Sequence, residues 1–281
     1  MRVENDSSLA KYTTLRVGGT AGTLWFPETK EELRALRAEF PAAPLLGGGS
    51  NLLINDRRVF EDVICLREFD ASVRYEADGT VSVGSGLPLS RLISDLNAHG
   101  QGGIEYLCSV PGLVGGAIVM NAGRGKQYHQ QISDYLLTAD YLENGKIQTL
   151  EKSACRFGFR SSVFQERDGV ILSARFRFDS VAPEEGARRC RERMELVRKS
   201  HDNRYPNAGT TFCEADPGIM KLFSAAGGRK KGGIRFSDRQ PNRLQNRGEG
   251  TFAEAEARIS AVEKMHAWLG KSCRLEYAVW R

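Results

Sequence analysis

The chain has 281 residues and a formal net charge of +5, and its hydrophobic content is ordinary for a globular protein. This length suits two domains or one large one with an ample core. The mild positive charge fits an anionic small molecule better than a nucleic-acid backbone. No apolar stretch is long enough to span a bilayer, and the first residues lack the apolar region of a secretory signal. We therefore expect a cytoplasmic protein that binds neither nucleic acid nor a membrane.

The first part of the chain, residues 11–70, alternates strands with a helix. Strands are expected at residues 21–26, 44–46 and 63–66, where apolar runs are bounded by turn residues. Thr29 is a good helix cap, and the apolar residues that follow it recur on one helical face. This pattern predicts a small α/β unit.

The pattern then changes to hairpins. Residues 73–84 and 135–150 each contain two strand-like runs joined by a glycine turn. A helix is expected between them at residues 88–99, and a late strand at residues 169–176. Together these elements predict a mixed sheet with flanking helices.

The last hundred residues are richer in helix. A strongly charged helix is expected at residues 184–199, and further helices at residues 218–226 and 252–269. Residues 273–280 are expected to form one closing strand.

Two glycine-rich segments are the most informative feature of the sequence. Residues 45–54 read LLGGGSNLLI, and residues 110–123 read VPGLVGGAIVMNAG. Each places glycines where an apolar strand stops, and such a turn exposes backbone N–H groups to an anion such as a pyrophosphate. The first segment is neither a P-loop nor a Rossmann fingerprint. Either segment alone is equally well explained as a tight turn, but the two together suggest a dinucleotide held from two sides.

The six cysteines offer no metal site. They are scattered along the sequence, and neither a C-x-x-C pair nor a histidine cluster accompanies them. We expect reduced, mostly buried thiols, as in cytoplasmic proteins.

Four further segments complete a resemblance to a known family. TLRVGG at residues 14–19, FGFRSSVF at 157–164, AGTTF at 208–212 and the closing Leu275-Glu276 join the two glycine segments. In order and spacing they resemble the UDP-N-acetylenolpyruvoylglucosamine reductases, in the shorter form of that family. The resemblance covers essentially the whole chain and is most specific before residue 175.

The resemblance implies an α+β fold. Its main part is an FAD-binding fold of the vanillyl-alcohol-oxidase type, built from two α/β subdomains at residues 1–70 and 71–182. Residues 183–281 are then expected to form a C-terminal α/β substrate domain.

The resemblance also implies the chemistry. In this family NADPH reduces FAD, and the flavin passes a hydride to the enolpyruvyl group of a nucleotide sugar, which yields a peptidoglycan precursor. The expected cofactors are therefore FAD and NADPH. The expected partner is a nucleotide sugar or another anionic small molecule, and the chain is expected to be a monomer or a weak homodimer.

The residues expected to contact FAD lie in the two glycine segments and in one strand. They are Gly47, Gly48, Gly49, Ser50, Asn51, Leu52, Pro111, Gly112, Val114, Gly115, Gly116, Ala117, Asn121, Gly123 and Ile171.

Two catalytic positions follow from the resemblance. Arg160 matches the arginine that stabilises the enolate formed when hydride adds to the vinyl carbon, and a fixed cation there should supply a large part of catalysis. Thr210 stands where the family has a proton-donating serine, and its hydroxyl can do the same chemistry. Ser162 should brace either the turn beside Arg160 or the edge of the flavin. Cys213 could be a further donor.

The closing segment departs from the family pattern. The family's catalytic glutamate corresponds to Ala278, which can neither donate a proton nor polarise an enolate. Glu276 lies two residues earlier, and on a continuous strand it would share the face of Ala278. We therefore name Glu276 as the third catalytic candidate.

Three functions remain open at this stage. The chain could be a divergent reductase of this family, a flavoprotein that acts on another anionic substrate, or a non-catalytic protein that binds flavin or a nucleotide sugar. A dense basic stretch at residues 229–247 could contact a diphosphate or form a solvated loop.

Overall fold

A computed structural model describes residues 1–124, 129–227 and 232–281. The chain forms two compact units, neither of which is continuous in sequence. Unit 1 consists of Met1–Glu4, Leu24–Gly48 and Asp62–Val197, and unit 2 of Asn5–Thr23, Gly49–Glu61 and Arg198–Arg281. The three-part division at residues 1–70, 71–182 and 183–281 stays a prediction.

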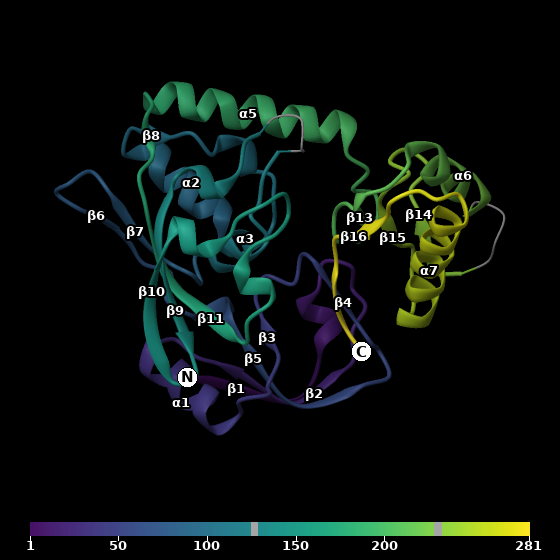
Figure 1. Ribbon diagram of the computed structural model, residues 1–281, viewed down its shortest axis with the longest axis horizontal. Coiled ribbons are helices and arrows are strands. Elements are labelled where there is room, and N and C mark those ends of the chain that lie inside the picture. The colour runs from purple at the N-terminus through teal and green to yellow at the C-terminus, as the bar shows by residue number, and fades with distance from the viewer. Residues whose placement is uncertain (125–128, 228–231) are drawn as a thin grey trace. The chain divides into compact units, whose positions relative to one another are not determined.

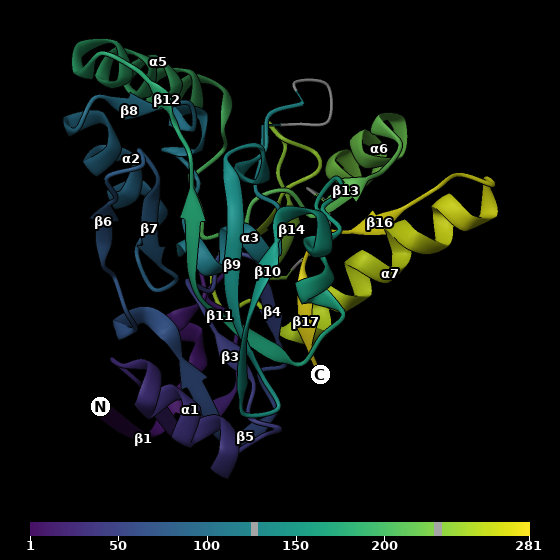
Figure 2. The same cartoon turned by 60° about the vertical axis from the view of Figure 1, so that its left-hand side comes forward.

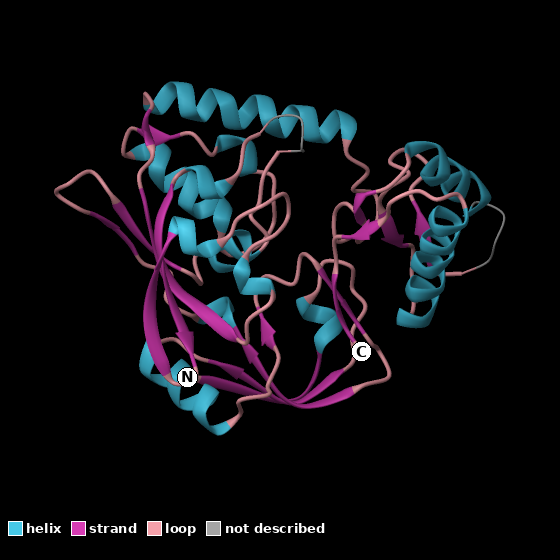
Figure 3. Ribbon diagram, in the orientation of Figure 1, coloured by secondary structure: helices cyan, strands magenta, loops and turns pink. Residues whose placement is uncertain are grey.

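The described residues mix helices and strands, which confirms the α+β class (Figure 3). The helices are α1 (Lys30–Glu39), α2 (Leu89–Ala98), α3 (Val114–Val119), α5 (Pro183–Ser200), α6 (Pro217–Gly227) and α7 (Phe252–Trp268). The strands of the first half are β1 (Arg2–Ser8), β2 (Thr20–Phe26), β3 (Leu45–Leu46), β4 (Leu52–Ile54), β5 (Val59–Cys65), β6 (Val73–Tyr75), β7 (Val81–Gly84) and β8 (Gln101–Gly102). Those of the second half are β9 (Leu136–Glu143), β10 (Lys146–Glu151), β11 (Gly169–Phe176), β12 (Asp179–Ser180), β13 (Phe212–Glu214), β14 (Ile234–Phe236), β15 (Leu244–Asn246), β16 (Arg274–Leu275) and β17 (Ala278–Trp280).

The largest sheet belongs to unit 1 and is antiparallel, with strand order β10-β9-β11-β7-β6. Helices α2 and α3 cover one face of it (Figures 1 and 2). Leu89, Leu92, Ile93 and Leu96 of α2 recur at helical spacing and are at most 2% exposed, so the burial of this stripe fixes the helix on the sheet.

Helix α1 packs on the opposite face of the same sheet. Its Leu33 and Leu36 share a hydrophobic cluster with Leu142 of β9 and with Val170 and Leu172 of β11. Alternate residues of a strand point to opposite faces, so β9 and β11 contribute to both cores. The predicted cap is confirmed as well, since the Thr29 side chain accepts a hydrogen bond from the Glu32 N–H at the start of α1.

Unit 2 has its own core, built from short strand pairs and two helices. The pairs are β13–β16, β14–β15 and the parallel pair β17–β4. Ala255, Ile259 and Val262 of α7 pack in this core with Phe212 and Tyr277. The helices and hairpins predicted from the sequence are all found within one or two residues of their expected ends.

Two predictions about local structure are wrong. The closing segment is two short strands rather than one, because β16 pairs with β13 and β17 pairs with β4. The second glycine segment does not follow a strand. It follows a 3-10 turn at Glu105–Leu107 and leads into the short helix α3.

The cysteines are also less buried than predicted. Cys65 and Cys155 are buried, whereas Cys108, Cys190, Cys213 and Cys273 are partly exposed, and all six are free thiols. Across the described residues, no helix is long and apolar enough to cross a membrane. In the same part of the chain no group of three or more metal-ligating side chains gathers.

Candidate active site

The two glycine segments meet inside unit 1. A Cβ atom placed on Gly48 would lie 2.7 Å from the Cα of Gly112 and 3.3 Å from its carbonyl carbon. Real Cβ atoms do not come so close to backbone, so only glycine permits this approach. Gly112 itself has a φ of +134°, a conformation that L side chains rarely adopt. The two glycine segments are therefore in direct contact, and their use as one cofactor site stays a prediction.

Beside this contact, two glycines face open space. A Cβ on Gly47 or on Gly116 would meet nothing within 4 Å in the protein. Glycine at such positions lets a ligand approach the backbone closely. Bare backbone next to a close contact between two glycine turns fits the phosphate part of a dinucleotide, and FAD therefore fits the residues present.

Some of the predicted cofactor contacts have other roles in the structure. The N–H groups of Val114 and Gly115 donate to the carbonyls of Leu87 and Ser85, both at 2.9 Å. A Cβ on Gly115 would lie 2.9 Å from the Ser85 Cβ, so this glycine also serves close packing. These two amides anchor α3 and are not available to a phosphate.

Three other residues that are predicted to contact FAD differ in how exposed their side chains are. Ala117 and Ile171 are buried, at 8% and 3% exposed, in the core between α2, α3 and the large sheet. Pro111 is exposed at the start of the second segment.

The end of the first glycine segment belongs to unit 2, where it contacts the closing segment. The Asn51 Nδ2 donates to the Glu276 carbonyl at 2.8 Å, and the Ala278 N–H donates to the Asn51 carbonyl at 2.9 Å. Leu52 pairs with Ala278 across the parallel β4–β17 ladder. Gly49 has a φ of +69°, and a Cβ there would lie 1.8 Å from the Tyr12 carbonyl oxygen. Ser50 is half-buried in the same turn.

Arg160 lies at a tight turn of unit 1, closed by reciprocal backbone hydrogen bonds between Gly158 and Ser161 of 3.0 and 3.3 Å. Its own φ is +55°, an uncommon conformation for a residue with a side chain. Its Nη2 donates to the carbonyl of Gly123 at 2.9 Å. The arginine is therefore attached to the end of the second glycine segment, and its catalytic role stays a prediction.

The neighbours of Arg160 hold its turn against α3. Ser162 Oγ donates to the Val119 carbonyl at 2.6 Å, so the expected brace is confirmed. Asn121 Nδ2 donates to the Gly158 carbonyl at 2.9 Å, from a residue whose own φ is +42°. Asn121, Gly123 and Arg160 line one small hollow of about 10 Å³, roughly the room that a single water molecule needs.

The turn that carries Thr210 is fixed from within unit 2. Thr210 is exposed, whereas Thr211 is fully buried, so the two side chains point to different sides. Thr211 Oγ1 accepts from the Leu244 N–H at 3.0 Å and lies 3.3 Å from the hydroxyl of Tyr277. That hydroxyl also donates to the Gly209 carbonyl at 3.4 Å.

Glu276 and Ala278 do not lie on one continuous strand, which corrects the premise taken from the sequence. Glu276 lies between β16 and β17 and is in neither ladder, and the backbone bends at Tyr277, whose side chain enters the core. The Glu276 N–H donates to the Thr211 carbonyl at 2.8 Å. Glu276 is thus tied to the Thr210 turn by its backbone, and Ala278 is exposed.

Cys213 lies close to this turn but is engaged elsewhere. Its thiol contacts the carbonyls of Arg274 and Leu275 at 3.4 and 4.0 Å. Burial raises the pKa of this thiol, which makes it a weaker acid than an ordinary cysteine.

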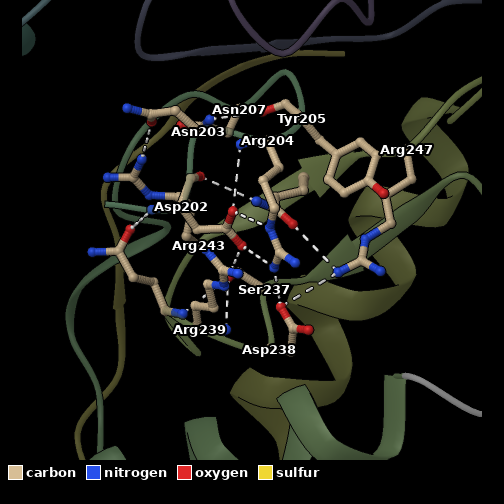
Figure 4. A network of polar contacts seen from close by, with 12 residues as sticks. Asp202, Asn203, Arg204, Tyr205, Asn207, Ser237, Asp238, Arg239, Arg243 and Arg247 are labelled. Carbon is tan, nitrogen blue, oxygen red and sulfur yellow. Dashed lines mark hydrogen bonds and ion pairs between the residues drawn. The ribbon is translucent and has the colours of Figure 1, made fainter. Parts of the chain in front are cut away.

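The basic stretch is partly structural (Figure 4). Residues 229–231 lie outside the described residues. Arg243 is 8% exposed and donates to Asn203 Oδ1 at 2.7 Å, and the guanidinium of Arg247 lies 4.9 Å above the Tyr205 ring. At these two positions the basic side chains pack inside unit 2 and do not form a solvated loop.

A buried aspartate organises the same region. The Asp202 side chain is fully buried, pairs with Arg204 at 2.7 and 2.8 Å, and accepts from Ser237 Oγ at 2.5 Å. Arg204 holds the pKa of this carboxyl well below its usual range. On the other side Arg204 contacts Asp238, which is 63% exposed. Sequence reasoning missed Asp202 and Tyr277, because nothing local in the sequence marks that Ser237 lies 35 positions from Asp202, or that the partners of Tyr277 lie 66 and 68 positions away.

The comparisons with known proteins identify the family of the chain. Residues 23–151 match the family model described as an FAD binding domain. The chain is 33% identical to UDP-N-acetylenolpyruvoylglucosamine reductase 1 of Bacillus cereus, over 93% of the chain and 88% of that protein. It is also 33% identical to the reductase of Carboxydothermus hydrogenoformans, over 97% of the chain and 91% of that protein.

A solved structure gives the same result for the fold. The crystal structure of UDP-N-acetylenolpyruvylglucosamine reductase (MurB) from Thermus caldophilus is similar, with a TM-score of 0.79 at 30% identity, and all of both chains is covered. The fold class predicted from the resemblance is confirmed. The chain belongs to the family of UDP-N-acetylenolpyruvoylglucosamine reductases, and it is an FAD-dependent oxidoreductase.

Proposed function

We propose that the chain reduces UDP-N-acetylglucosamine enolpyruvate to UDP-N-acetylmuramate with NADPH, with Arg160 and Thr210 as its principal catalytic residues. The observation that carries this proposal is the hydrogen bond of 2.9 Å between Arg160 and the carbonyl of Gly123. It fixes a cation at the end of the glycine segment that we assign to FAD.

The reaction requires a fixed positive charge. When hydride adds to the vinyl carbon, negative charge develops on the neighbouring carbon and its carboxylate. Arg160 is held by a constrained turn and a backbone carbonyl, so its guanidinium needs little reorganisation to stabilise that charge. Lysine would keep the charge but lose the planar fork that can hold a carboxylate with two hydrogen bonds.

The reaction also requires a proton donor. Thr210 carries an exposed hydroxyl on a turn whose backbone is fixed through Gly209, Thr211 and Tyr277. Because Tyr277 and Thr211 are buried, they do not act on substrate, and their role is to hold the turn. Glu276, tied to Thr211 through its backbone, is the remaining candidate to assist the donor.

Bound FAD would supply the chemistry of hydride transfer between NADPH and the enolpyruvyl group. Gly47 and Gly116 would hold the cofactor, because their missing side chains leave the backbone open, and the close contact of Gly48 with Gly112 would keep the two glycine segments together beside it. The six free thiols fit a reducing, cytoplasmic compartment. We keep the expectation of a monomer or weak homodimer as a prediction.

The test separates the two halves of the reaction in the variant Arg160→Ala. We expect this variant to bind FAD and to lose its flavin absorbance with NADPH at the parental rate. Recovery of the absorbance on anaerobic addition of the enolpyruvyl nucleotide should be roughly 10²–10³-fold slower, as is typical when one stabilising group is removed.

Arg156→Ala provides the matched control. Arg156 also has a positive φ, lies four residues away and forms an exposed ion pair with Glu166. It should leave both half-reactions unchanged. Parental recovery in Arg160→Ala, or an equal loss in the control, would contradict the assigned role.

A further inference from the structure

Two cysteines that are far apart in sequence lie side by side in unit 1. Cys108 follows the 3-10 turn at Glu105–Leu107, and Cys190 lies in the middle of α5. The Cys108 thiol lies 3.7 Å from the carbonyl oxygen of Cys190 and is within hydrogen-bonding range of its sulfur. Both residues are partly exposed and both thiols are free.

The contact is part of a continuous seam between the two segments. Arg189 and Arg193 flank Cys190 on the same face of α5, one helical turn apart. Arg189 lies 3.9 Å from the carboxylate of Glu105, and Arg193 Nε donates to Ser109 Oγ at 3.1 Å. These two contacts flank the cysteines on either side and hold them next to each other.

The environment of Cys190 favours its thiolate. Asn97 Nδ2 of α2 donates to the Cys190 sulfur at 3.5 Å, and the Cys108 thiol can donate to the same atom. These two donors lower the pKa of Cys190 to about 7. The pKa of Cys108 is raised, because its thiol proton is hydrogen-bonded to Cys190 and because the side chain is partly desolvated. Cys190 is therefore the thiol that favours the reactive thiolate form, and Cys108 lies close enough to attack the Cys190 sulfur once that sulfur is oxidised.

We propose that Cys108 and Cys190 are a modification site, at which a peroxide converts the two thiols into a reversible disulfide that clamps α5 to the segment leading into Pro111–Gly112. This inference does not depend on the proposed reductase reaction.

The chemistry balances in two steps. The Cys190 thiolate attacks hydrogen peroxide, which is reduced to hydroxide as the cysteine becomes a sulfenic acid. The Cys108 sulfur then attacks the sulfenic sulfur, and the hydroxyl leaves as water with the Cys108 proton. Two thiols have been oxidised by one peroxide. In a reducing compartment such a bond is transient, and thiols such as glutathione return it to the reduced form.

The first experiment uses the unmodified FAD-bound protein with a slight excess of hydrogen peroxide. We expect the number of titratable thiols to fall from six to four, the mass to fall by two hydrogen atoms, and a peptide that links Cys108 to Cys190. Dithiothreitol should restore all six thiols. Six remaining thiols, a different pairing, or only intermolecular disulfides would overturn the proposal.

The second experiment measures reactivity at pH 7 by alkylation with iodoacetamide. The lowered pKa of Cys190 raises its thiolate fraction above the few per cent of an ordinary cysteine. Allowing for the lower nucleophilicity of a more acidic thiol, Cys190 should react at least about fivefold faster than Cys213. Cys213 is a suitable reference because it is also half-buried, but its pKa is raised. Equal rates would count against a preorganised site.

Two variants separate the steps. In C108S the peroxide should leave Cys190 as a sulfenic acid that is trapped by dimedone, because no second thiol can condense with it. In C213S the internal disulfide should form as in the parent. A disulfide that still forms at Cys190 within the C108S chain would overturn the assignment of Cys108.

Discussion

Gly116 gives a prediction in which stability and cofactor affinity change in opposite directions. It lies in α3, is exposed, and a Cβ there would meet nothing within 4 Å in the protein. Alanine is preferred to glycine inside a helix by roughly 0.5–1 kcal/mol. The variant Gly116→Ala should therefore stabilise the FAD-free protein by that amount, which raises its Tm by about 1–4 °C.

The same methyl group should weaken FAD binding, because it fills space that we assign to the cofactor. Overpacking a fitted site typically costs about 1–3 kcal/mol, which corresponds to a Kd roughly 5- to 150-fold higher. The assay combines thermal melting of FAD-stripped protein with a fluorescence titration of FAD into the same preparation.

Gly48→Ala is the matched control. Its Cβ would lie 2.7 Å from the Gly112 Cα, so the backbone must shift and both stability and FAD affinity should fall. If Gly116→Ala bound FAD as tightly as the parent, the open space beside α3 would not be the cofactor site and the reasoning would be refuted.

Three further predictions concern unit 2. Ala278 is exposed, so Ala278→Glu should change the free energy of unfolding little. The restored carboxylic acid should speed the substrate half-reaction in single-turnover experiments, by up to the 10²–10⁴-fold that such groups supply. A parental rate would show that the carboxylate is not needed there. Tyr277→Phe should cost about 1 kcal/mol in urea denaturation and slow the same half-reaction while flavin reduction by NADPH stays parental; no change in the substrate step would remove its positioning role. Because the pKa of Asp202 is lowered in the folded protein, its ionised carboxylate stabilises the fold above the ordinary carboxyl pKa near 4, and this stabilisation is lost as the pH falls below that value. Asp202→Asn should therefore flatten the fall of the unfolding free energy between about pH 5 and pH 2. Asp238→Asn, at the exposed end of the same Arg204 contact, should flatten it much less.

The sequence was informative where local patterns decide the structure. Apolar spacing placed α2 and α7, and the Asn144-Gly145 pair, with positive φ at both residues, marked the turn between β9 and β10. The glycine segments were recognisable because close approach of backbone excludes any side chain. These signals are carried by a few neighbouring residues and need no knowledge of the fold.

The sequence was uninformative where distant residues meet. The close approach of Gly48 to Gly112 and the pairing of Cys108 with Cys190 arise from packing, which leaves no mark at either position alone. The closing strand was predicted as one because period-2 alternation cannot show where a strand changes partners. Within it, Tyr277 turns into the core to meet a hydroxyl 66 residues away.

The most direct measurement follows product formation by mass spectrometry in an anaerobic mixture of the purified protein, FAD, NADPH and UDP-N-acetylglucosamine enolpyruvate. We predict one UDP-N-acetylmuramate for each NADPH consumed, with turnover abolished when FAD is removed and restored when it is returned. NADPH consumption without this product, or no consumption by the FAD-loaded protein, would contradict the account.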